Sequence, residues 1–487
     1  MPKFSLSGQF TVLFSLLWMS VCSLLVVLLA CARMNTMQYR MEESVSSVLS
    51  SLFSRYEKNL FERYGIFAFA LSEEKIEQYI RKDLEAYAQS DSWSAWEVED
   101  VSILEMSGVS DSFGVYLEEA AKLVSSDGNF ALGMLKKLEG WIGWVKKSES
   151  IPVEKLSQDS VSKMQEQLLQ SEQTNFMDVL TQWMGKISLS FLEEEKYSPF
   201  TLSQKDKVSR NFNSSSWDNS ISQSTFLDRY LWNQYIQNHF SHFLNAKNQE
   251  QKTQLLYEQE YILGGALSDK ENLQQIAGKI FTLREVMNGI SFLQDQKKKN
   301  ETKALAAVLS LIFAVPELTG IIEHAIRVLW INTESEMDVQ ALLSGKKVWF
   351  YKNAHQWRSK WQDIFWVKEP INEIQSNQQL PVRQKDDFIA SKILIQKMNV
   401  EIAREEDEAK DIQNLGELSY INYLSIFLAL ENPLEQRYRV MDLIQSNLRM
   451  EIPNFSLEHS YYAMEVSCHF RYLGDKEYWI SKKRKYH

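Results

Sequence analysis

Two histidines, His239 and His242, are the residues whose type and spacing come nearest to a metal site. Three residues apart on a helix they would share one face, where both imidazoles could approach a zinc ion with nearby carboxylates. A zinc site needs further ligands at a characteristic spacing, and the sequence supplies no third ligand of that kind. We therefore expect a surface or core histidine pair and predict no metal.

Serine–lysine pairs with S-x-x-K spacing occur at Ser160/Lys163 and at Ser344/Lys347. The K-T-G motif that accompanies such a pair in serine acyl enzymes is missing, so we interpret both as chance. The sequence also lacks G-x-G-x-x-G, Walker A, H-E-x-x-H, G-x-S-x-G and EF-hand motifs. We therefore predict no catalytic residue and no cofactor, and the sequence identifies no small-molecule substrate.

Four tryptophans, Trp349, Trp357, Trp361 and Trp366, stand close together in the sequence. They could line a groove for a sugar or a peptide, but large aromatic side chains more often pack in cores and interfaces. We expect packing. An extracytoplasmic enzyme or ligand-binding protein that uses this tryptophan-rich region remains the alternative.

The composition indicates a large, folded, acidic protein. The chain has 487 residues, 44% of them hydrophobic and 12% aromatic, which is enough for two or three subdomains. Its net charge of −11 argues against a general nucleic-acid binder, because phosphate neutralisation needs clustered Lys and Arg. Basic runs occur only at residues 297–299 and 482–485, and we expect both to be solvated surface.

An uncharged segment near the start predicts a membrane anchor. Between Lys3 and Arg33 there is no charge, and residues 10–31 are almost continuously apolar. As a helix these 22 residues span about 33 Å, enough to cross a hydrocarbon core of about 30 Å. The side chains expected to contact the lipid bilayer are Phe10, Val12, Leu13, Phe14, Leu16, Leu17, Trp18, Val21, Leu24, Leu25, Val26, Val27, Leu28 and Leu29.

Cleavage is the alternative to a retained anchor. Residues 30–32 imitate a signal-peptide cleavage site, and residues 28–31 imitate a lipobox that would leave Cys31 acylated. The apolar segment exceeds the 7–15 residues usual for a signal peptide, so we expect retention. Cys468 is the only cysteine well outside the segment, which excludes a disulfide within the polar body. The flanking charges do not settle the orientation.

The helical pattern continues beyond the membrane. Apolar residues recur every three or four positions, and no helix-breaking residue occurs before Gly65. This pattern predicts one continuous helix of about 55 residues, roughly 80 Å long. A short linker followed by a separate surface helix is the alternative. The apolar positions of the continuing helix are Met34, Met37, Met41, Val45, Val48, Leu52 and Tyr56.

Strands are predicted near both ends of the chain. Residues 66–70 form a short buried strand, a helix follows over 73–89 with Ser72 as its N-cap, and residues 96–106 form a second strand. Alternation over residues 462–472 predicts the clearest strand of the chain. We expect the N- and C-terminal strands to meet in one antiparallel sheet against the long helix.

The region between these strands is predicted to be helical. Ser268 and Glu271 form a capping box before a helix, and residues 305–315 indicate a buried helical hairpin rather than a second span. Further expectations are loops within 148–224, a strand at 348–351, an acidic turn at 405–408, and helices around 418–430 and 436–448. The predicted regions are a cytoplasmic stub (1–9), a transmembrane helix (10–32), a long helix with the first strands (33–108), a helical insertion (109–455) and a C-terminal strand with a basic tail (456–487).

The start of the chain resembles the anchor of TadE/TadG-like pseudopilin proteins, in residues 7–12, 32–33 and 63–67. More specifically, the chain resembles a family of large uncharacterised membrane proteins of Gram-positive bacteria whose genes accompany Tad-type pilus assembly machinery. The downstream segments similar to that family are 257–265, 268–273, 336–346, 420–430 and 439–445. The resemblance implies a location and a system, and no reaction.

One position departs from the pilin pattern. Prepilin peptidases usually cut after a Gly followed five residues later by Glu, whereas Leu13 stands five residues after Gly8. The resemblance therefore implies an accessory component rather than a filament subunit. We predict an α+β, mainly α, single-pass protein of the cell membrane, with a pilin-like helix on a small sheet, the bulk outside the cytoplasm, and other Tad-like assembly proteins as partners. A lipoprotein acylated at Cys31 is the further alternative.

Overall fold

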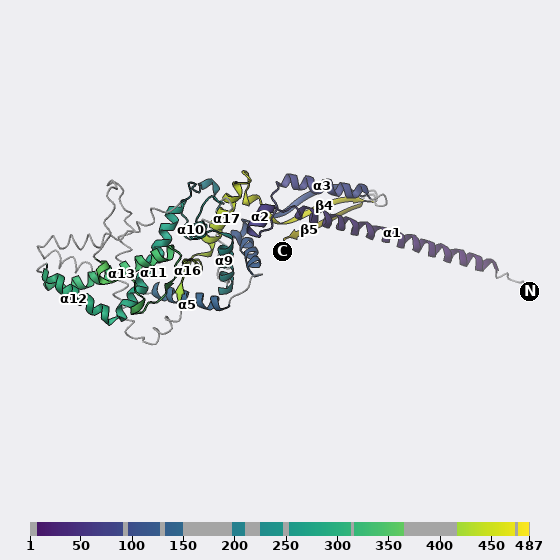
Figure 1. Cartoon of the computed structure of the whole chain (residues 1–487). Coiled ribbons are helices and arrows are strands. Elements are labelled where there is room, and N and C mark those ends of the chain that lie inside the picture. The colour runs from purple at the N-terminus through teal and green to yellow at the C-terminus, as the bar shows by residue number, and fades with distance from the viewer. Residues whose placement is uncertain are drawn as a thin grey trace, which may run out of the picture. The chain divides into compact units, whose positions relative to one another are not determined.

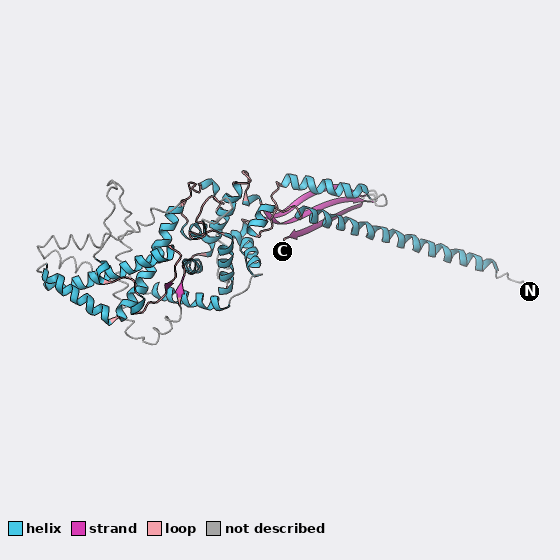
Figure 2. Cartoon of the chain, in the orientation of Figure 1, coloured by secondary structure: helices cyan, strands magenta, loops and turns pink. Residues whose placement is uncertain are grey.

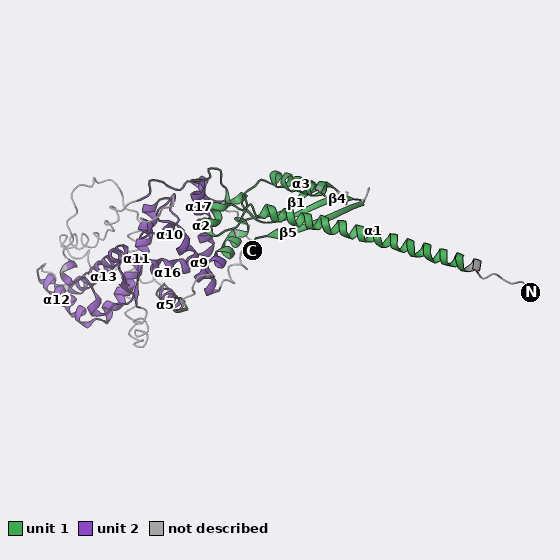
Figure 3. Ribbon diagram, turned by 45° about the vertical axis from the view of Figure 1, so that its right-hand side comes forward, with its two compact units in different colours: residues 1–120, 451–487 green, residues 121–450 purple. Residues whose placement is uncertain are grey.

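The fold was analysed in a computed structural model, shown in Figures 1 and 2. The structure describes residues 7–90, 96–126, 132–149, 197–209, 225–246, 253–312, 316–364, 416–472 and 476–486. It divides into two compact units, unit 1 with residues 1–120 and 451–487 and unit 2 with residues 121–450 (Figure 3). The sequence predicts a helical insertion over residues 109–455, and unit 2 covers residues 121–450. The fold is mainly helical with a small antiparallel sheet.

Unit 1 contains an antiparallel sheet in the order β1-β4-β5. β4 lies in the centre, so strands from the two ends of the chain meet as expected. The elements of unit 1 are α1 (Ser7–Phe53), α2 (Lys58–Tyr64), α3 (Glu73–Ser90), β1 (Trp96–Gly108), a 3-10 turn (Asp111–Gly114), the start of α4 (Val115–Ser126), a 3-10 turn (Leu457–His459), β4 (Tyr461–Tyr472) and β5 (Lys476–Lys485).

The second half of α1 and one face of α3 cover the same side of this sheet. Alternate residues of β4 are buried, since one face of the strand meets the helices and the other does not. This shared apolar core includes Met37, Met41, Val45, Val48, Leu49, Leu52 and Phe53 of α1, Ile76, Ile80 and Leu84 of α3, and Met464, Val466, Cys468 and Phe470 of β4.

The predicted unbroken rod is wrong beyond Phe53, where α1 ends. The backbone N–H of Glu57 leaves the helical ladder and donates to the carbonyl of Ala68 at 2.8 Å, so the chain turns before α2. Gly65 then caps the C-terminal end of α2 in the left-handed conformation, with φ of 69°, which glycine adopts without steric cost. α1 is nevertheless 47 residues long, about 70 Å at 1.5 Å per residue.

Two expectations about strands are corrected. Residues 66–70 form no strand, and only Phe69 makes an isolated bridge, to Tyr461. The predicted basic tail is β5, an edge strand of the sheet. Its alternate cations are directed to α1, where Lys482 donates to Ser46, so the run at 482–485 is not simply solvated surface.

The described residues of unit 2 form helices and a two-stranded ladder of β2 with β3. Its elements are the second half of α4, α5 (Leu132–Glu149), α9 (Phe226–His239), α10 (Glu258–Gly264), α11 (Asp269–Gln294), α12 (Gln296–Ile312), α13 (Thr319–Leu343), β2 (Val348–Trp349), β3 (Glu417–Leu418), α16 (Tyr420–Leu430) and α17 (Pro433–Arg449), with 3-10 turns at Gln204–Asp206, Pro316–Leu318, Ala354–Gln356 and Trp361–Ile364. The predicted helices near 418–430 and 436–448 correspond to α16 and α17.

Local signals explain the start of α11 and the hairpin that follows it. Ser268 is the N-cap of α11 and accepts a hydrogen bond from the N–H of Glu271 at 3.3 Å, which is one of the two hydrogen bonds of the predicted capping box. α12 and α13 then pack side by side, so the hairpin is confirmed. The expectation that it is buried is wrong at Val308, Leu311 and Ile312, which are 54%, 73% and 68% exposed.

Several sequence-based expectations lie outside the described residues. They concern most of the loop region 148–224, the pair Ser160/Lys163, the acidic turn at 405–408 and Trp366.

Candidate functional site

The first half of α1 carries every predicted anchor residue on an exposed helix. Residues 10–33 are all exposed, and the large apolar side chains range from 37% exposed at Val21 to 72% at Met19. In water such exposure is unfavourable by about 25 cal/mol for each Å² of apolar surface, whereas a lipid core removes that penalty. Among the described residues α1 is the helix long and apolar enough to cross a membrane, with a mean hydropathy of 2.6 in its most apolar window.

The predicted anchor residues are all exposed on this helix, and their contact with lipid stays a prediction. They are Phe10, Val12, Leu13, Phe14, Leu16, Leu17, Trp18, Val21, Leu24, Leu25, Val26, Val27, Leu28 and Leu29. Gly8 lies in the first turn of α1, and Cys31 is exposed near the end of the apolar segment.

The same helix enters the folded core without a break. Arg33 is exposed, Met34 is half-buried, and Met37 and Met41 are 2% and 0% exposed. The change takes two helical turns, because from Met37 onward one face of α1 packs on the sheet. The apolar segment is therefore continuous with a helix of the unit 1 core.

The two histidines do not lie on one helix, because α9 ends at His239. The helix face that their spacing could have given is therefore not formed. His242 is buried, its Nδ1 accepts a hydrogen bond from the N–H of Leu244, and burial lowers its pKa to about 4. Within the described part of the chain, no three His, Cys, Asp or Glu residues are arranged to hold a metal ion.

Ser344 and Trp357 have structural roles. The hydroxyl of Ser344 donates to the carbonyl of Ala341 at the end of α13, at 2.8 Å. Trp357 packs against Phe292 and Trp330 and donates to Ser291, so the packing interpretation is confirmed for it. Trp349 and Trp361 are 37% and 39% exposed.

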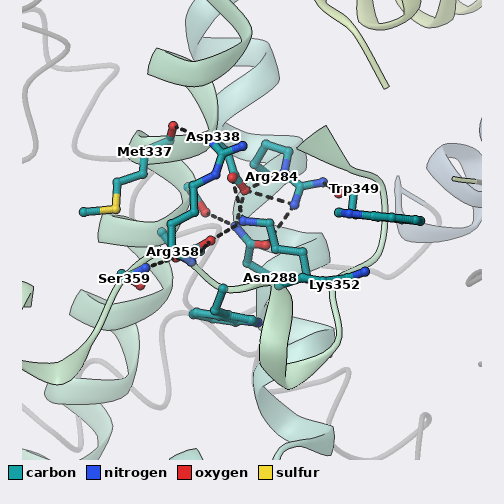
Figure 4. Close-up of polar contacts among 12 residues, drawn as sticks. Arg284, Asn288, Met337, Asp338, Trp349, Lys352, Arg358 and Ser359 are labelled. Carbon is teal, nitrogen blue, oxygen red and sulfur yellow. Dashed lines mark hydrogen bonds and ion pairs between the residues drawn. The ribbon is translucent and has the colours of Figure 1, made fainter. Parts of the chain in front are cut away.

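A buried network of charged side chains was missed by the sequence analysis (Figure 4). We call it the ionic clamp and define it as Arg284 and Asn288 of α11, Glu334 and Asp338 of α13, and Lys352. None of these residues is more than 2% exposed. Two cations face two carboxylates, so the formal charges within the clamp cancel.

Arg284 and Asp338 form the centre of the ionic clamp. The Nε and Nη2 atoms of Arg284 each lie 3.0 Å from Oδ2 of Asp338, and the other carboxylate oxygen accepts from Lys352. Nη1 of Arg284 also donates to the carbonyls of Trp349 and Phe350, at 2.9 and 2.8 Å. Burial alone would raise the pKa of Asp338, but Arg284 and Lys352 outweigh it and hold that pKa below its usual value.

Glu334 extends the ionic clamp to the following segment. It accepts from the ammonium of Lys352 and from the backbone N–H groups of Arg358 and Ser359, the last at 2.7 Å. Most donors and acceptors of the clamp are thus directed at one another and at the backbone of residues 349–359, and Arg284 and Asn288 also donate to the hydroxyls of Tyr423 and Ser335. The geometry indicates that the clamp holds residues 349–359 against α11 and α13. Its only local sequence signal is that residues 284 and 288, and residues 334 and 338, are i and i+4 pairs.

Glu260 is a second unpredicted feature, because it is a fully buried carboxylate with no cation partner among the residues that the structure describes. Its Oε1 accepts from the hydroxyl of Tyr420 at 2.6 Å and from the N–H of Phe243 at 3.0 Å. Its Oε2 has no hydrogen-bond partner among the described residues. Burial raises the pKa of Glu260 to about 7, against the lowering effect of these hydrogen bonds.

Comparison with known proteins assigns a family to the chain. A model for a family of unknown function (DUF5702) matches residues 166–472, which is more than half of the 487 residues. The chain belongs to this family. No curated protein and no solved structure matches it. The match to DUF5702 contains the ionic clamp, Glu260 and β4, and it does not include α1.

Proposed function

We propose that this DUF5702 protein is a membrane-anchored, non-enzymatic, pseudopilin-like accessory component of a Tad-like, type IV pilus-related assembly or secretion system of Gram-positive bacteria. α1 is its single membrane span, with a cytoplasmic stub before it and both units outside the cytoplasm. One observation carries the proposal. A single helix exposes an apolar surface over residues 10–33 and buries its next turns in the core of unit 1.

This continuity supports an anchor that also fixes the body. A flexible tether would only keep a domain near the membrane, whereas a helix shared by lipid and core transmits its tilt and rotation to the sheet. Proteins that assemble side by side at a membrane need such a fixed orientation. The resemblance of residues 7–12 and 63–67 to TadE/TadG-like anchors supports the same role.

The polar clusters of unit 2 support a structural rather than a catalytic role. A catalytic group must reach a substrate, and its pKa must suit proton transfer at the working pH. The charged groups of the ionic clamp are at most 2% exposed and bond to one another. Glu260 has a pKa of about 7 but is 0% exposed, so no substrate reaches it without rearrangement.

Membrane fractionation tests the anchor. Leu24, within the apolar segment, and Leu104, in β1, are 59% and 58% exposed. Arg near the middle of a membrane helix is unfavourable by about 2.5–3.5 kcal/mol on insertion scales, so L17R/L24R is expected to lose stable membrane association. The matched L104R variant is expected to stay in the membrane pellet after a high-salt wash. A soluble native protein that begins beyond residue 32 would overturn the proposal.

A clean deletion strain tests the system. Loss of surface pili, restored by the native chain and by L104R but not by L17R/L24R, is the expected result. Co-purification of other pilus-assembly proteins with the detergent-solubilised chain would support the partner class. Normal pilus formation in the deletion strain would contradict the role. Protease digestion of intact protoplasts tests the orientation, because only an external body is cleaved.

A further inference from the structure

β5 runs beside the second half of α1, in the same direction. Hydrogen bonds connect the two elements in register along their whole shared length. The pairs, in order along both elements, are Lys476 with Met34, Tyr478 with Glu42, Lys482 with Ser46, Arg484 with Ser50, and Tyr486, just after β5, with the carbonyl of Phe53.

The two lengths agree. Met34 to Phe53 corresponds to about 28 Å of helix, and Lys476 to Tyr486 corresponds to about 33 Å of strand. α1 and β5 are therefore nearly parallel. One end of β5 lies where the apolar segment stops, and the other end lies far from it. We call the first the near end of the sheet and define it by Lys476, Tyr472 and Trp96, which adjoin one another in the ladder.

Lys476 lies at the membrane boundary of α1. Its ammonium is 3.2 Å from the sulfur of Met34, and Met34 directly follows Arg33, the first charge after the apolar segment. The polar headgroup region on each side of a bilayer is several ångströms thick, since the whole bilayer is about 40–45 Å and its hydrocarbon core about 30 Å. An ammonium within one helical turn of the hydrocarbon edge lies in that region.

Two cations at the near end, Lys476 and Arg33, have no carboxylate partner among the described residues. Arg471 is paired with Glu97 and Glu99, at 2.8 and 2.9 Å. The thioether beside Lys476 does not neutralise its charge, and no described carboxylate lies within ion-pair distance of Arg33. Anionic groups in the adjoining headgroup layer complement both cations.

We propose that the near end of the sheet contacts anionic lipid headgroups through Lys476 and Arg33, so that unit 1 stands directly on the bilayer. This inference rests on the membrane anchoring in the proposed function. It assigns the occupant of the near end from two observations, the continuity of this end with the apolar segment and the two cations there, Lys476 and Arg33, that have no carboxylate partner among the described residues. The far end, about 30 Å away, lies well beyond a Debye length of about 8 Å from the lipid surface.

Fluorescence quenching in reconstituted vesicles tests the contact. The full chain with C31S carries a fluorophore at native Cys22, or, with C22S added, at E477C near the membrane or at K485C on the same strand far from it. Cys468 is buried and burial raises the pKa of its thiol to about 12, so mild labelling spares it. The vesicles contain phosphatidylcholine and phosphatidylglycerol, and one lipid at a time carries a headgroup quencher.

The expected result is strong headgroup quenching at residue 477 and little at residue 485. Quencher-labelled phosphatidylglycerol should act roughly twofold more strongly than labelled phosphatidylcholine at residue 477, and K476Q should reduce that preference. Equal quenching at 477 and 485, or equal quenching by the two lipids, would overturn the inference. An acyl-chain quencher that fails at Cys22 would instead refute the anchoring itself, so the two failures are distinguishable.

Discussion

The sheet core of unit 1 and the ionic clamp of unit 2 bury their side chains in different ways. The core between α1, α3 and the sheet of unit 1 is built from apolar side chains that recur with helical or strand periodicity. In unit 2 the ionic clamp buries four charged side chains between α11, α13 and the segment after β2. The first arrangement needs complementary shape, while the second needs particular atoms at particular distances.

The difference teaches what each region can tolerate. Apolar burial is non-directional and proportional to area, so an apolar core accepts a neighbour of similar volume. A buried charge has lost its water, and only its partners compensate for that loss. We interpret the ionic clamp as holding residues 349–359 in one conformation. The apolar sheet core of unit 1 mainly stabilises the fold.

Removing one carboxylate from the ionic clamp should give the largest effect. D338A leaves Arg284 and Lys352 buried with Glu334 as the remaining carboxylate, and breaking a buried pair costs about 3–5 kcal/mol. The expected result is a lower urea midpoint for unit 2, followed by tryptophan fluorescence of the solubilised full chain.

The matched control for D338A is E301A on α12. Glu301 pairs with Lys297 at 4.0 Å, and the lysine side chain is 84% exposed, so its loss should change stability by less than about 0.5 kcal/mol. Similar shifts for D338A and E301A would contradict the view that the clamp is held by buried charge.

Glu260 sharpens the comparison, because it is a buried carboxylate with neutral partners. Its pKa of about 7 lies above the ordinary value of 4.5, so between these pH values the folded protein keeps a proton that the unfolded chain has lost. The free energy of unfolding therefore falls as the pH rises through this window, by about 3 kcal/mol in total at 1.36 kcal/mol per pKa unit. E260Q removes this loss and should be more stable than the native chain at pH 8, and nearly equal near pH 4.5.

His242 changes stability with the opposite sign. Burial lowers its pKa from 6.5 to about 4, so the unfolded chain binds a proton first and stability falls as the pH drops through that range. Because both proteins keep His242, the difference between their urea midpoints isolates Glu260. A difference that is the same at pH 5 and pH 8 would show that Glu260 does not titrate as described.

The sequence alone predicts most of unit 1. Regular spacing marks the second half of α1, and strict alternation marks β4, because each pattern reflects one buried face. The end of α1 at Phe53 was missed, since the N–H of Glu57 bonds to a distant carbonyl, that of Ala68. β5 was missed because its run of cations looks like a solvated tail, although Lys482 and Arg484 bond to serines of α1.

The ionic clamp could not be predicted in the same way. Its members come from two helices and a loop, and Arg284 and Asp338 are 54 residues apart in sequence. Each helix alone shows only two polar residues on one face, which is also typical of a solvated stripe. Pairing across elements is tertiary information, and periodicity within one element does not contain it.

Conservative substitutions give the smallest and most selective test of the comparison. R284K keeps the charge and the pair with Asp338, but a lysine lacks the planar fork that reaches the carbonyls of Trp349 and Phe350 at the same time. A buried carbonyl left without a donor should cost about 1–3 kcal/mol.

L52M in the core of unit 1 conserves volume and should cost less than about 1.5 kcal/mol, because methionine adapts to the space that Leu52 fills. Both variants are compared by urea midpoints, and hydrogen exchange of residues 349–352 locates the damage. Faster exchange in R284K alone is expected; equal tolerance of R284K and L52M would mean that the two cores obey the same rule, and the contrast drawn between the units would fail.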